Sequence, residues 1–224
     1  MIEDGFLGPA APELGWVPAP RYLMRRARIL PQLNALARGR LLEVGPGAGM
    51  LLIEAARCGF RCEALELSAE ARALTEAAIA QSSQMIPVHA DASAEWNQSF
   101  DALLAFDVLE HIEHDRDALK QWHSWLVPNG TLLLSVPAHM RMWSAGDEWA
   151  GHFRRYEREP LVQLLREAGF EPELVEGYGF PLTNLSERVG ARTYAKRILR
   201  GTGSVEDRHR NNDRSGTERG PHLK

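Results

Sequence analysis

Residues 41–49, Leu-Leu-Glu-Val-Gly-Pro-Gly-Ala-Gly, decide the fold. They place three glycines at alternate positions between an apolar run over 40–44 and a helical pattern over 50–57. Glycine adopts positive φ without strain and lets a ligand approach the backbone closely, so the stretch predicts a sharp strand-to-helix turn beside a ligand. The dinucleotide fingerprint G-x-G-x-x-G needs a glycine where this chain has Met50. A turn with a purely structural role stays open as an alternative.

Strand-like and helix-like segments alternate on both sides of this turn. We expect further strands over 61–67, 85–89, 100–106, 131–136 and 174–178, and helices over 22–36, 68–80, 115–126 and 160–168. This alternation predicts an α/β fold with a doubly wound, mainly parallel sheet, on which ligands bind beyond the carboxyl ends of the strands.

Composition divides the chain into four parts. These are an N-terminal arm and helix (1–38), the main α/β domain (39–180), a C-terminal helix (181–200) and a polar tail expected to be disordered (201–224). Prolines and glycines over 5–20 predict no regular element there, while the aromatic residues of this arm predict that it lies against the domain. Basic residues at four-residue spacing over 182–200 indicate a solvated face or a weak contact with an anionic membrane surface.

The charge and cysteine content limit the partners and the compartment. The 224 residues include 26 Lys and Arg against 30 Asp and Glu, a net charge of −4, which gives no general attraction to nucleic acid. Cys58 and Cys62 are too few for a disulfide scaffold. No apolar run reaches the ~18 residues of a membrane span, and the first residues lack a signal-peptide pattern. We therefore expect a soluble, cytoplasmic protein; the oligomeric state is left open.

Two acidic residues follow the strands next to the glycine turn. Glu66 ends the strand over 61–67, where a carboxylate can accept hydrogen bonds from both hydroxyls of a ribose. Asp91 follows the strand over 85–89, within reach of the amine of an adenine. Either residue alone is equally well an ordinary solvated carboxylate. Because parallel strands end at one edge of the sheet, the two residues and the glycine turn together predict an adenosine site.

Five stretches occur in the order and spacing of a known family: LLEVGPGAG, ALELS, HADA, FDALLAFDVLEHI and LVPNGTLLLSVP. Over residues 40–179 the chain resembles the class I S-adenosylmethionine-dependent methyltransferases. Members of that family close the sheet with an antiparallel strand; this last strand is not evident after residue 178, and we expect an incomplete C-terminus. The resemblance implies that S-adenosylmethionine is the cofactor and that a small molecule is methylated, most readily on oxygen. It implies cofactor contacts from Glu43, Gly45, Gly47 and Gly49 (methionine end), Glu66 and Leu67 (ribose), Asp91 and Ala92 (adenine), Phe106 (amino group, through its backbone), and Arg25 or Arg26 (carboxylate).

The segment Asp107-Val108-Leu109-Glu110-His111 follows the strand over 100–106, beside the expected methyl group. If a helical turn starts there, Asp107, Glu110 and His111 share one face. His111 would then serve as a general base, the three side chains would hold Mg²⁺, or the group would only cap the turn. The segment resembles that of the quinol O-methyltransferases of ubiquinone synthesis, where two acidic residues and a histidine bind a divalent ion. Asp107 replaces the usual glutamate of that set.

A connection of ~20 residues follows the strand over 131–136, and connections this long are usually functional. Its candidates for binding the methyl acceptor are His139, Trp143, His152, Arg154, Arg155 and Tyr156. Alternatively, the arginines pair with nearby carboxylates and the aromatic residues pack in the core. The pattern VPA…WS.GD…GH.RRY resembles a group of bacterial methyltransferases (methyltransferase type 11) whose substrates are mostly unassigned.

Two other functions remain alternatives at this point. One is a module that binds S-adenosylmethionine without turnover and acts through partners. The other is an NAD(P)-dependent oxidoreductase, which Met50 in place of the third glycine disfavours. The sequence leaves open the acceptor, the choice among O-, N- and C-methylation, and the need for a metal.

Overall fold

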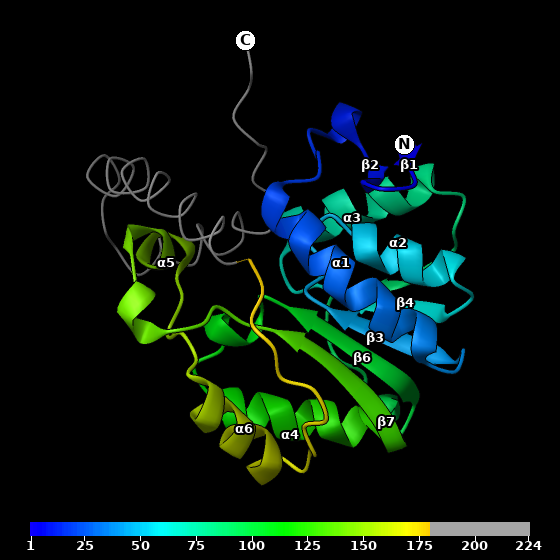
Figure 1. The fold of residues 1–224 in the computed structure, drawn as a ribbon. Helices are drawn as coiled ribbons and strands as arrows, with labels where there is room; N and C mark the ends of the chain where they lie inside the picture. The colour runs from blue at the N-terminus through cyan, green and yellow to red at the C-terminus, as the bar shows by residue number, and fades with distance from the viewer. Residues whose placement is uncertain (180–224) are drawn as a thin grey trace.

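The computed structural model describes residues 1–179 and builds them around a parallel five-stranded sheet (Figure 1). The strands lie in the order β5-β4-β3-β6-β7, with every neighbouring pair parallel. They span Arg40–Val44 (β3), Arg61–Leu65 (β4), Val88–His89 (β5), Phe100–Phe106 (β6) and Leu126–Ser135 (β7). After β5 the chain crosses back to place β6 on the other side of β3, so the strand order reverses between β3 and β6. The predicted doubly wound sheet is therefore confirmed.

Helices cover both faces of the sheet, as Figure 1 shows. On one face lie α1 (Pro20–Ala35), α2 (Met50–Arg57) and α3 (Ala69–Gln81); on the other lie α4 (Asp115–Trp125) and α6 (Arg158–Glu167). Successive strand residues point to opposite faces. Leu41 and Leu104 therefore join the core under the first group of helices, whereas Leu42 and Leu103 join the second, and all four are fully buried.

The N-terminal arm contains regular structure, which corrects the expectation of none over residues 5–20. Strands β1 (Ile2–Asp4) and β2 (Gly8–Ala10) form a short antiparallel hairpin, followed by a 3₁₀ turn at Pro12–Leu14 (η1). The Asp4 carboxylate accepts the N–H groups of Phe6 and Leu7 and so tightens the turn between the strands. The arm lies against the domain as predicted, because Ala11 is fully buried in the core.

Two further corrections concern the second half of the chain. The predicted strand over 174–178 is not formed in the described structure, because the segment makes no ladder with a neighbour and instead brings Tyr178 beside Ser135 at the carboxyl edge of the sheet. The long connection after β7 is also more regular than expected, with a 3₁₀ turn at Met140–Met142 (η4) and helix α5 at Ala145–Ala150.

Short 3₁₀ turns at Ala94–Trp96 (η2) and Leu109–His111 (η3) complete the described elements. The expectations for the helix over 182–200 and the tail over 201–224 lie outside the described residues. None of the helices within 1–179 combines the length and the apolar character needed to cross a bilayer.

Candidate functional site

The glycine turn joins β3 to α2 at the carboxyl edge of the sheet. Gly45, Gly47 and Gly49 have φ of 65°, 56° and 73°, a region that side chains disfavour. A Cβ on Gly45 would lie 2.6 Å from Cγ2 of Val108. From the other side, Thr75 of α3 donates its hydroxyl to the Gly47 carbonyl at 2.6 Å. The predicted sharp turn is thus confirmed. Its contact with Thr75 could not be predicted from the sequence.

Glu43 lies in β3, two residues before Gly45, and is buried inside the protein. Only 3% of the residue is exposed, and its Oε2 has no hydrogen-bond partner among the described residues. Burial, reinforced by the negative charge of Glu66, raises the pKa of Glu43 to about 8, although Arg25 acts in the opposite direction. A buried carboxyl of this kind is costly to the fold and suits a cationic or hydrogen-bonding ligand.

Glu66, Leu67, Asp91 and Ala92 lie together past the ends of β4 and β5. The Glu66 N–H donates to the His89 carbonyl at 2.9 Å, which ties the two strand ends together. Leu67 is 71% exposed, and Asp91 and Ala92 are also exposed. The residues predicted for ribose and adenine therefore share one accessible edge, and their contact with a cofactor stays a prediction.

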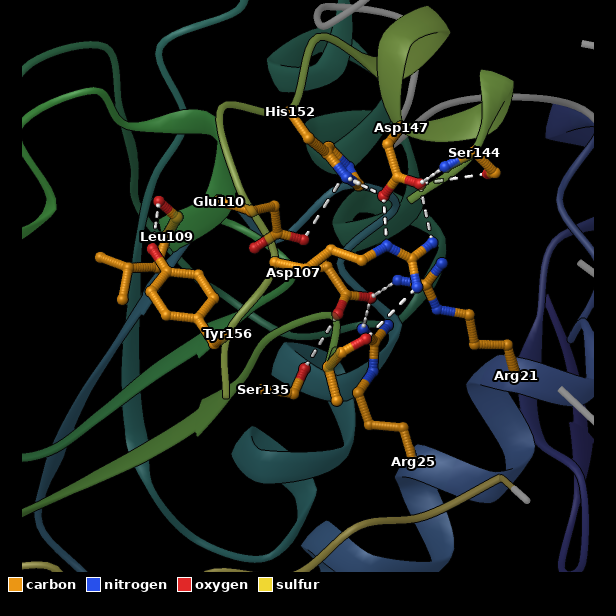
Figure 2. A network of polar contacts seen from close by, with 12 residues as sticks. Arg21, Arg25, Asp107, Leu109, Glu110, Ser135, Ser144, Asp147, His152 and Tyr156 are labelled. Atoms are coloured by element: carbon orange, nitrogen blue, oxygen red, sulfur yellow. Dashed lines mark hydrogen bonds and ion pairs between the residues drawn. The ribbon is translucent and has the colours of Figure 1, made fainter. Parts of the chain in front are cut away.

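Asp107 follows β6 and is held by basic residues of α1 (Figure 2). Its Oδ2 accepts from Arg21 Nη2 and from Arg25 Nη1, both at 2.6 Å, and its Oδ1 accepts from the Ser135 hydroxyl at 3.2 Å. Burial alone would favour the neutral carboxyl, but the two guanidinium groups lower the pKa of Asp107 to about 2. Asp107 is therefore an anion that the protein has already paired.

Arg25 and Arg26, the two candidates for the cofactor carboxylate, differ in their partners. Arg26 binds the carboxylate of Glu54 through Nε and Nη2 and the carbonyl of Phe6 through Nη1, which commits it to the arm and α2. Arg25 faces the site, with its guanidinium 5.5 Å from the centre of the Phe106 ring. Its Nε is buried without a hydrogen-bond partner in the described part of the chain, so Arg25 has a donor to offer a ligand.

Glu110 and His111 meet His152, not Asp107. The expected common face of positions 107, 110 and 111 is wrong, because Asp107 has φ of 57° and lies outside the 3₁₀ turn Leu109–His111. Instead one ligand atom each from Glu110, His111 and His152 lies within 4.8 Å of the others. The rings of His111 and His152 stack edge to face with centroids 4.6 Å apart, and His152 Nε2 is 4.0 Å from Glu110 Oε1.

Burial governs the protonation of this group. Glu110 is fully buried, which together with the nearby charge of Asp107 raises its pKa well above the ordinary range. Burial, with a contribution from His152, lowers the pKa of His111 to about 4. Neither carboxylate oxygen of Glu110 nor the Nδ1 of His111 has a hydrogen-bond partner within the described residues. The site thus brings two polar side chains with unpartnered buried atoms, Glu110 and His111, next to His152.

Asp147 organises the other side of this group, as Figure 2 shows. Its Oδ1 is 2.9 Å from Nδ1 of His152, and both of its oxygens accept from Arg155, at 2.7 Å from Nε and 2.8 Å from Nη2. The same carboxylate accepts from the Ser144 N–H and closes a capping box at the start of α5. Although Asp147 is 1% exposed, its bonds to His152 and Arg155 keep its pKa far below the ordinary range.

The remaining predicted acceptor residues have structural partners. Arg154 Nη1 pairs with Asp115 at 2.6 Å, and the buried Tyr156 donates its hydroxyl to the same carboxylate at 3.1 Å. His139 is half exposed and pairs with Glu157 at 2.8 Å, and Trp143 is partly buried. Of the six candidates, the structure brings His152 and Arg155 to the Glu110 group.

Arg21 and Ser135 belong to the site but were not among the predicted residues. Ser135 ends β7, so the rule that ligands gather at strand ends points to it. Arg21 precedes Arg25 by four residues, the spacing that places two side chains on one face of a helix. Both patterns are present in the sequence, but neither singles out Arg21 or Ser135 until the structure shows that Asp107 binds both residues.

Comparison with known proteins agrees with this geometry. The family model described as a methyltransferase domain matches residues 19–175. A ubiquinone biosynthesis O-methyltransferase of Xanthomonas euvesicatoria is 29% identical over 175 residues, which is 70% of this chain and 73% of that protein. Among solved structures, a candidate methyltransferase of Bacillus halodurans has a TM-score of 0.63 at 19% identity, covering 82% of this chain and 87% of that one. Phosphoethanolamine N-methyltransferase 2 of Haemonchus contortus has a TM-score of 0.59 at 18% identity, covering 84% and 46%.

Proposed function

Because the chain belongs to the methyltransferase domain family, we propose that its carboxyl-edge residues bind S-adenosylmethionine and present the methyl group to an oxygen of a small molecule. That the chain is an S-adenosylmethionine-dependent methyltransferase of small molecules follows from the match over residues 19–175 and from its relatives. The relatives named as ubiquinone biosynthesis O-methyltransferases support transfer to oxygen. The match favours neither a nicotinamide-dependent enzyme nor a binding module without turnover.

The arrangement of the glycine turn with Glu43 and Glu66 carries the assignment of the cofactor residues. Three positive-φ glycines leave the backbone open beside the buried carboxyl of Glu43, which suits the ammonium group of the cofactor's methionine part. Arg25 has an unused buried donor for the carboxylate of the same part. We assign Glu66 and Leu67 to the ribose, Asp91 and Ala92 to the adenine, and the Phe106 backbone to the amino group.

Methyl transfer from S-adenosylmethionine mainly requires that the protein align the acceptor with the methyl group. In an in-line displacement the acceptor oxygen forms a bond to the methyl carbon while the bond from sulfur to that carbon breaks, leaving S-adenosylhomocysteine. Holding the two reactants in line can supply ~7–11 kcal/mol of barrier reduction. A hydroxyl acceptor must also lose its proton, and we assign the acceptance of that proton to the neutral imidazole of His111. Its Nδ1 has no hydrogen-bond partner in the described residues, and the ring lies beside Glu110 and His152.

The Mg²⁺ set suggested by resemblance, Asp107 with Glu110 and His111, does not fit this chain. Asp107 gives its Oδ2 to two guanidinium groups at 2.6 Å and its Oδ1 to Ser135. Mg²⁺ prefers an octahedron of oxygen ligands, and this site offers two histidines beside Glu110. We therefore derive no step of the reaction through Mg²⁺.

Calorimetric titration of the full chain with S-adenosylhomocysteine tests the proposal. We expect one-to-one binding that Glu66→Gln weakens about 10- to 100-fold, since hydrogen bonds to a charged acceptor contribute ~1.5–3 kcal/mol. Glu76→Gln on the exposed side of α3 serves as the matched control and should leave the affinity unchanged, and NADH should not bind. Absence of S-adenosylhomocysteine binding, or equal affinity in Glu66→Gln, would contradict the assignment. Transfer of a labelled methyl group to a small quinol would then test the acceptor class.

A further inference from the structure

Glu110, His111 and His152 converge from two separate parts of the chain. Glu110 and His111 belong to the turn Leu109–His111, whereas His152 follows α5 by two residues. Their backbones are joined as well, because the Phe153 N–H donates to the Glu110 carbonyl at 2.8 Å. The convergence of the side chains is therefore built into the backbone and does not depend on three flexible side chains finding one another.

The spacing of the three ligand atoms suits one shared ion. Each atom lies within 4.8 Å of the other two, and the Glu110 Oε1 to His152 Nε2 distance is 4.0 Å. Two atoms bound at about 2.1 Å to one ion lie at most about 4.2 Å apart. Side-chain rotations that move the atoms by less than about 1 Å would bring all three to the coordination distances of d-block ions such as Zn²⁺ or Fe²⁺.

Glu110 supplies an independent indication of a cation. The side chain is fully buried and accepts no hydrogen bond in the described structure, although a buried carboxylate normally has several donors. Its contact with His152, at 4.0 Å, is too long for a hydrogen bond. The adjacent Nδ1 of His111 is likewise buried without a partner among the described residues. A bound cation would satisfy these oxygen and nitrogen atoms together.

His152 is oriented as metal-binding histidines are. Its Nδ1 lies 2.9 Å from the carboxylate of Asp147, which leaves Nε2 directed at Glu110. Arg155 holds that carboxylate with two bonds, at 2.7 and 2.8 Å. A carboxylate on the far nitrogen fixes the ring and makes the near nitrogen a better ligand, and this support is in place here.

We propose that Glu110, His111 and His152 bind a divalent transition-metal ion such as Zn²⁺ or Fe²⁺. Two imidazoles and one carboxylate form a set typical of these ions and leave coordination positions open. Its role rests on the proposed function: a hydroxyl bound at an open position would lose its proton more readily, and the proton would pass to water. With the ion bound, the three side chains would act as its ligands and not as the base. Binding of the ion is independent of that role.

Titration of the metal-stripped, tag-free chain with Co²⁺ tests the site without any assay of turnover, because the visible absorption of Co²⁺ reports its ligands. We expect one equivalent to bind, to be displaced by Zn²⁺ and to resist excess Mg²⁺. His152→Ala and Glu110→Gln should weaken binding by more than about 100-fold, and Asp147→Asn by about 10- to 100-fold. Asp107→Asn and the surface variant His139→Ala should retain it.

Circular dichroism and binding of S-adenosylhomocysteine identify the variants that are folded, and Glu110→Gln keeps the test valid if His152→Ala does not fold. Failure of the wild-type chain to bind Co²⁺ would overturn the proposal, and so would equal binding by folded Glu110→Gln. Loss of the ion in Asp107→Asn with retention in His152→Ala would overturn it in favour of the set that includes Asp107. Each of these results leaves the cofactor assignment intact if S-adenosylhomocysteine still binds.

Discussion

Glu43→Gln should stabilise the ligand-free protein at neutral pH. Burial raises the pKa of Glu43 from 4.5 to about 8. The folded state therefore keeps the proton between these two values, while the unfolded state releases it. The stability that this group contributes is fully present below pH 4.5 and is lost as the pH rises through about 8. Glutamine has nearly the same shape and stays neutral, so it escapes this loss.

The size of the effect follows from the shift. Each pKa unit corresponds to about 1.4 kcal/mol. A pH of 7 lies roughly 2.5 units above the pKa of the carboxyl in the unfolded chain, so keeping Glu43 protonated in the folded state costs about 3 kcal/mol. At pH 5 the same cost is about 1 kcal/mol. We expect the difference in unfolding free energy between Glu43→Gln and wild type to grow by about 2 kcal/mol from pH 5 to pH 7.

Urea denaturation across this pH range measures the difference directly. Other groups, including His111 and Glu110, also change stability with pH, but they do so equally in both proteins and cancel in the difference. Glu76→Gln, an exposed position on α3, should give a small and nearly constant difference. A flat difference for Glu43→Gln, or a variant less stable than wild type at pH 7, would show that Glu43 is ionised in the folded protein and would refute the reasoning.

Two other substitutions test the packing around the site. Gly45→Ala should cost about 1–3 kcal/mol and lower the melting temperature, because alanine would have to adopt positive φ and its Cβ would lie 2.6 Å from Val108. An unchanged melting temperature would contradict the strained turn. Arg155→Met should cost about 3–5 kcal/mol in urea denaturation, since Asp147 would be left buried without its two-bonded partner. The more exposed Arg154→Met should cost only about 1 kcal/mol, and equal losses in the two variants would argue against a special role for the Asp147 pair.

The sheet could be predicted from sequence where apolar runs are bounded by turns. The strands over 40–44 and 100–106 form as expected, because residues buried on both faces leave little freedom for another structure. The run over 174–178 has similar composition but makes no ladder in the described structure. A strand is stable only beside a neighbour, and composition does not show whether a neighbour is present.

The candidate site was predictable at the strand ends and not within the connections. Glu43 and Glu66 lie where strand order places them, whereas Asp107 turns away from Glu110 because its backbone takes positive φ. His152 contacts Glu110 although the two residues are more than 40 positions apart in the sequence. Helical spacing relates only residues three or four positions apart and therefore cannot predict this contact. The capping box of Ser144 and Asp147 at the start of α5 was not among the predicted features, and its spacing does not show that Asp147 also holds His152.

The double duty of Asp147 links local folding to assembly of the site. Helix α5 has only six residues, and a helix this short has little stability of its own. The carboxylate that caps its first turn is also the one that holds His152 and Arg155. Unwinding of α5 would therefore release both side chains in the same event, so the helix and the site should form and come apart as one cooperative unit.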